Sequence, residues 1–146
     1  MPSELTPDQV LRVVAALEAA WGGDDDALAA LVRGGSGERP LAVLIAEFGE
    51  SRLLKMVLVV LGIEGLEGAD LERAVAEYGQ SITPHLLGVA SGLMAGWALS
   101  AGEDVRATGD LARHILRALL YFTGSDDPEG VRALLAHLRT DALAHS

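Results

Sequence analysis

The chain has 146 residues, half of them hydrophobic, and carries a formal net charge of -10 from 11 basic and 21 acidic residues. A chain of this length can form one domain with a substantial core. It contains no cysteine, which excludes disulfides, thiolate metal sites and cysteine nucleophiles. The acidic balance disfavours nucleic-acid binding, because that binding needs Lys and Arg side chains to replace the counterions of the phosphates.

The first four residues include an acid and lack the basic and apolar regions of a signal peptide. We therefore expect a cytoplasmic protein. Lys55 is the only lysine, asparagine is absent, and Ala, Gly and Arg are abundant. This bias is typical of a GC-rich bacterial genome.

Start and stop signals divide the first part of the chain into helices. Residues 6–9 combine an N-cap, a proline and a capping-box glutamine. An apolar stripe then predicts a helix that runs to Trp21 and stops at Gly22 and Gly23. Three acids at 24–26 favour the start of a second, short helix. A flexible glycine-rich loop follows over about 34–39. Pro40 opens a third helix, which Gly49 is expected to weaken or bend.

The later part of the chain continues this pattern. Nearly every residue from 53 to 61 is apolar, which is typical of an enclosed helix. Asp70 is expected to cap a short helix, Thr83 and Pro84 open one that runs to about Ser100, and acids near 103 and 127 begin the last two. No segment alternates as a strand does.

These signals predict an all-α fold in which residues 1–146 form a single helical domain. We expect a compact bundle of about seven helices, arranged around two apolar central helices at about 53–61 and 84–100.

The most informative segment lies between residues 77 and 103, where no Asp, Glu, Lys or Arg occurs. Within it, three glycines recur every fourth residue and form one ridge of a helix. Each glycine in a helix interior costs about 1 kcal/mol relative to alanine, so the close approach of another helix is expected to offset this cost. The ridge and the small residues that flank it are Gly88, Gly92, Gly96, Ser91 and Ala95.

Several partners for this ridge remain open. It could pack against a helix of the same core such as 53–61, against a second copy of the chain in a homodimer, or against a ligand. Small residues at this spacing also occur where membrane helices meet. A membrane span is disfavoured, because glycine, serine and His85 give the segment a low mean hydropathy for a span.

Motifs that carry chemistry are absent. His114 and His137 each have an aspartate one helical turn away, a spacing that can orient an imidazole but that also describes ordinary surface pairs. The chain has no HExxH motif, no Glu-x-x-His pair, no P-loop and no GxSxG sequence. We predict no catalytic residue, no metal site and no cofactor.

We therefore predict a non-enzymatic interaction or regulatory module that binds another protein, itself or both through the glycine ridge. Immunity, antitoxin and scaffold roles all fit the acidic charge. The alternative is a small-molecule-binding bundle or small enzyme with an apolar pocket near His114. Trp97, Met94 and Tyr121 would form the walls of that pocket. We expect neither nucleic acid nor a membrane as a partner.

Overall fold

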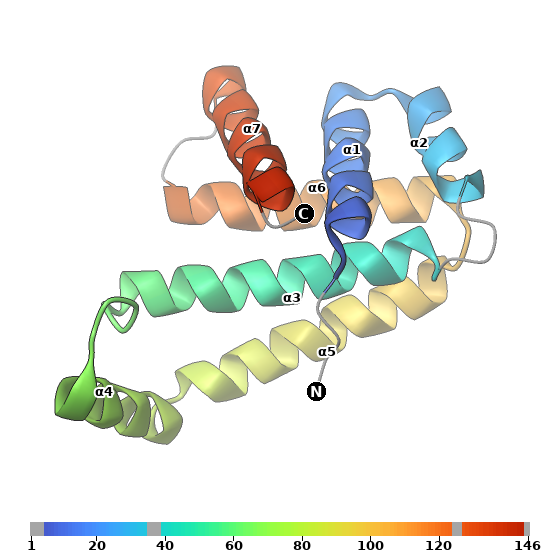
Figure 1. Ribbon diagram of the computed structural model, residues 1–146. Helices are drawn as coiled ribbons and strands as arrows, with labels where there is room; N and C mark the ends of the chain where they lie inside the picture. Colours follow the sequence, from blue (N-terminus) through green and yellow to red (C-terminus); the bar gives the residue numbers. More distant parts are fainter. Residues whose placement is uncertain (1–4, 35–38, 124–126, 145–146) are drawn as a thin grey trace.

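The computed structural model describes residues 5–34, 39–123 and 127–144. Over these ranges the chain forms seven α-helices and no strand (Figure 1), which confirms the predicted all-α fold. Most of the predicted loop at about 34–39 lies outside the described residues. The helices are α1 (Pro7–Gly22), α2 (Asp25–Arg33), α3 (Leu41–Val60), α4 (Gly68–Gln80), α5 (Thr83–Ala101), α6 (Val105–Thr123) and α7 (Pro128–Ala144).

The helices stack in layers (Figure 1). α5 lies along one side of α3 and α6 lies along another, while α1 and α7 cross α6 on the side away from α5. α2 packs on α1 and α6, and α4 contacts α5 at the far end of the α3–α5 pair. α5 is therefore an outer layer of the molecule.

Most of the hydrophobic core comes from α1, α6, α7 and the first half of α3, and Leu28 of α2 and Ala98 and Ala101 of α5 complete it. Leu17, Leu44, Leu119 and Leu138 come from α1, α3, α6 and α7, and solvent reaches almost none of their surface. All four are aliphatic, in keeping with a chain in which only 4% of residues are aromatic.

The sequence predicts that the two apolar helices lie at the centre of the bundle, but the structure places them at its side. Burial in α3 ends at Gly49, so the segment 53–61 is half-buried or exposed. In α5 only Ala98 and Ala101 are buried. α5 has no charged residue and residues 53–61 of α3 have only Lys55, and the α3–α5 contact covers one side of each. Within the described residues, most of the opposite side of α5 is left uncovered.

Four of the helices begin at a side-chain cap. In α1 the Thr6 hydroxyl accepts a hydrogen bond from the backbone N–H of Gln9, and the Gln9 side chain accepts one from the N–H of Thr6, so the predicted capping box is confirmed. Asp24, Asp104 and Asp127 accept in the same way at the starts of α2, α6 and α7. These caps satisfy amide groups that have no partner inside the helix.

One local prediction was wrong. Asp70 does not cap α4, because this helix begins at Gly68 and Asp70 lies within its first turn. At Gly49, where the sequence predicts a weakened or bent segment, α3 continues without a break to Val60. A Cβ atom at Gly49 would lie 2.8 Å from Cδ1 of Ile115 in α6, so the glycine allows these two helices to approach closely.

Candidate functional site

One side of α5 faces α3 and the opposite side is open. Leu87 and Met94 are half-buried on the inner side. On the open side, Leu86, Val89 and Leu93 have 59%, 62% and 70% of their surface exposed, and Leu99 has 79%. Isolated apolar residues on a surface are ordinary, whereas several on one side of an uncharged helix form an apolar patch. We call this surface the outer face of α5, consisting of Leu86, Gly88, Val89, Gly92, Leu93, Gly96 and Leu99.

The predicted glycine ridge lies in this outer face. Gly88, Gly92 and Gly96 are exposed, and a Cβ atom at any of them would meet no atom within 4 Å. Ala95 beside them is also exposed, and Ser91 is half-buried. The possibility that 53–61 packs against the ridge is therefore wrong for the described part of the chain, where the ridge faces open space.

Further exposed apolar side chains lie close to the ends of α3 and α5. Val59, Val60 and Leu61 end α3, and Ile82 precedes α5; each has more than half of its surface exposed. The α3–α5 pair therefore presents apolar groups at its tip as well as along α5.

His114 and Trp97 are in contact, with ring centroids 5.0 Å apart and ring planes tilted by 57°. Nδ1 of His114 donates to the main-chain carbonyl oxygen of Asp110 at 2.7 Å, and the Asp110 carboxylate pairs with Arg113. The carboxylate is thus engaged by the arginine, and the imidazole is oriented by the helix backbone.

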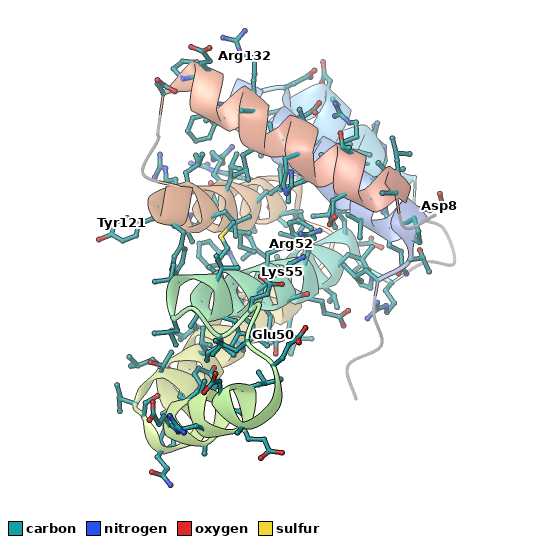
Figure 2. The ribbon with its side chains drawn as sticks, turned by 60° about the vertical axis from the view of Figure 1, so that its left-hand side comes forward. Asp8, Glu50, Arg52, Lys55, Tyr121 and Arg132 are labelled. Atoms are coloured by element: carbon teal, nitrogen blue, oxygen red, sulfur yellow. The ribbon has the colours of Figure 1, made fainter. Side chains whose placement is uncertain are left out.

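The other residues predicted around His114 do not all gather there. Met94 packs against the core, whereas Tyr121 is 88% exposed and points away from the body of the molecule (Figure 2). The structure therefore joins Trp97 to His114 and leaves Tyr121 outside this cluster. A ligand pocket at His114 stays a prediction.

Two surface hollows lie on other elements. One of about 440 Å³ lies between α1 and α7 and includes Trp21. The other, of about 250 Å³, lies between α3, the end of α6 and α7 and includes Arg52, Lys55 and His137. Neither hollow was predictable from local sequence patterns, because their linings come from helices far apart in the chain. The one available signal was Lys55, the only charged residue in the segment 53–61.

In the ranges that the structure describes, no group of three or more His, Asp or Glu side chains is arranged to hold a metal ion. In the same ranges no single helix has the length and apolar character needed to cross a membrane. α4 and α5 meet that criterion only as a pair, and they are bent by 62° relative to each other.

Comparisons of the chain with protein-family models, with curated proteins and with solved structures found no match. Its function is therefore inferred from its own surfaces.

Proposed function

We propose that the chain is a non-enzymatic interaction module that associates with a second copy of itself through the outer face of α5. The observation that carries this proposal is the exposure of Leu86, Val89, Leu93 and Leu99, each by more than half, on a helix without a charged residue. Fully covering a large aliphatic side chain contributes about 1.5–3 kcal/mol. We further propose a bacterial cytoplasmic setting, for which the sequence features are the support.

Charge favours a second copy as the occupant of this face. Each chain carries a net charge of -10, so two copies repel each other over most of their surfaces. Residues 78–102 contain no Asp, Glu, Lys or Arg. Two acidic chains therefore meet with least repulsion along α5.

The shape of the outer face is also self-complementary. It contains a groove, where Gly88, Gly92 and Gly96 lack side chains, and protruding groups such as Leu93. A two-fold axis brings the same patch of both copies together. Leu93 of one copy can then lie over the glycines of the other, and the helix axes can approach closely.

The size of the patch sets a further requirement. α5 has 19 residues and is about 28 Å long. A standard interface buries about 800 Å² per partner, which is more than one helix face supplies. We therefore include the exposed apolar residues Leu61 and Ile82, at the tip of the α3–α5 pair, in the proposed contact.

The proposal is tested by the substitution Leu93→Glu, measured by sedimentation equilibrium at micromolar concentration. The unmodified chain should have the mass of a dimer and the variant that of a monomer, because the substitution places two carboxylates in the contact. Circular dichroism should show unchanged helicity, since Leu93 is 70% exposed within one chain.

The matched control is Leu143→Glu, which makes the same change at a residue 55% exposed on α7, in another layer of the molecule. This variant should remain dimeric. A monomeric unmodified chain, or equal masses for the two variants, would contradict the proposal.

A further inference from the structure

The hollow between α3, α6 and α7 has an apolar wall that reaches from the core to the surface. Leu134 and Leu138 of α7 are buried, and Met56 of α3 is half-buried. Phe122 of α6 and Val59 of α3 form its exposed edge. The hollow has a volume of about 250 Å³ and is open to solvent on one side.

The basic groups of this hollow lie toward one end. Arg52 and Lys55 precede the apolar lining residues of α3 and lie on the side of α3 that faces α7 (Figure 2). Arg52 donates to the Asp141 carboxylate at 2.6 Å, which places the later part of α7 beside this end. His137 extends the polar lining on α7. The helix rises about 12 Å between Arg52 and the exposed Val60, so the hollow is polar at one end and apolar at the other.

Lys55 is the cation best placed to receive an anion. Asp141 pairs with Arg52, whereas none of the ion pairs between described residues involves Lys55. Lys55 is exposed at the hollow and is the only lysine of an acidic chain. An ammonium group at the mouth of an apolar hollow is complementary to a ligand with an anionic head and an apolar tail.

The larger hollow between α1 and α7 lacks such a group. Its two arginines are engaged, since Arg139 pairs with Glu18 and Nε of Arg132 donates to the carbonyl oxygen of Pro128 at 3.3 Å. An anion would have to compete with these contacts. The smaller hollow is therefore the stronger candidate site.

We propose that the smaller hollow binds a medium-chain carboxylate. The carboxylate lies at Lys55, and the ring of His137 supplies a second donor. The hydrocarbon tail follows Met56, Leu134 and Leu138 toward Phe122. The volume suits a tail of the length found in octanoate, and a longer tail extends into solvent. A ligand of about ten non-hydrogen atoms is expected to bind with a dissociation constant of about 1 mM.

The single lysine allows a selective test with octanoate. Reductive methylation with isotope-labelled formaldehyde labels only Lys55 and the amino terminus, and it keeps both charges. During a titration followed by NMR, the Lys55 methyl signal should move along a saturating curve. The signal from the amino terminus should stay in place and thereby report non-specific effects.

Calorimetry with variants tests the role of the charge. Lys55→Gln should weaken octanoate binding about tenfold. The matched control Arg73→Gln removes a cation from the exposed surface of α4 and should leave binding unchanged. Leu93→Glu should also leave it unchanged, so failure of this proposal is distinguishable from failure of self-association.

Octanol serves as the uncharged ligand and should bind at least about tenfold more weakly than octanoate. The proposal is overturned by equal binding of octanol and octanoate, or by equal octanoate binding to Lys55→Gln and the unmodified chain. Absence of a saturating Lys55 shift at about 10 mM octanoate, a concentration well above the expected dissociation constant, overturns it as well.

Discussion

Two glycines inside helices of the inner region and three on the outer face of α5 have opposite surroundings. The inner region comprises α1, α2, α6, α7 and the first half of α3; the outer region comprises the second half of α3 with α4 and α5. In the inner region, a Cβ atom at Gly49 would lie 2.8 Å from Ile115, and one at Gly109 would lie 2.8 Å from Leu28. The three glycines of the outer face of α5 meet nothing within 4 Å. A helical glycine therefore indicates a close contact only where a packing partner is present.

The helix starts differ between the two regions as well. In the inner region α1, α2, α6 and α7 begin at side-chain caps, and only α3 starts there without one. In the outer region neither α4 nor α5 has a side-chain cap bond. Caps stabilise a helix locally, by about 1 kcal/mol each. The helices of the outer region therefore depend more on packing, and packing in one chain leaves much of their apolar surface exposed.

The largest expected contrast comes from the same truncation in each region. Leu44→Ala removes a fully buried side chain and should lower the free energy of unfolding by about 2–5 kcal/mol. Leu93→Ala should change the free energy of unfolding of the monomer by less than about 0.5 kcal/mol. Urea denaturation at protein concentrations below dimer formation measures both. Similar losses would show that the two regions are equally packed.

A smaller contrast is expected from adding one methyl group. Gly49→Ala should lower the free energy of unfolding by about 1–3 kcal/mol, because the buried Ile115 must shift. Gly92→Ala should raise that of the monomer by up to about 1 kcal/mol through helix propensity. The same alanine should weaken self-association if helices approach closely at that position. Thermal unfolding of dilute samples measures the stability of the monomer, and sedimentation of concentrated samples measures self-association. If Gly92→Ala destabilised the monomer, the outer face of α5 would not be open at this position.

The smallest contrast concerns the two threonines at helix starts. Thr6→Ala removes a capping-box acceptor and should cost about 1 kcal/mol of unfolding free energy. Thr83→Ala removes a hydroxyl that caps nothing at the start of α5, so its cost should be less than half of this. Equal shifts in the midpoint of urea unfolding for these variants would show that local capping does not distinguish the two regions.

Much of the fold was predictable because helix signals are local. The capping box at Thr6 and Gln9 and the start near Thr83 and Pro84 involve residues at most four positions apart, and the structure has helices at both places. The same kind of local signal wrongly predicted Asp70 as a helix cap, because α4 begins earlier, at a glycine with positive φ. Local patterns thus locate helices well and their first residues less well.

The candidate sites were predictable only in part. Trp97 and His114 do meet, yet Tyr121, on the same helix as His114, is exposed and points away. Lys55 stands out in an apolar segment, but nothing in the sequence connects it with His137. Both residues line the same hollow because α3 and α7 each pack against α6, which is a matter of long-range packing.

The sequence by itself determined the helices, the uncharged segment of residues 78–102 and the acidic balance, because these follow from residue type and local spacing. Only the tertiary structure decided which sides of these helices are covered. A helix that is apolar all round carries no periodic signal to distinguish a buried side from an open one. The packing of α3 against α5 and α6 determines which sides are covered. It leaves the outer face of α5 open and a hollow beside Lys55.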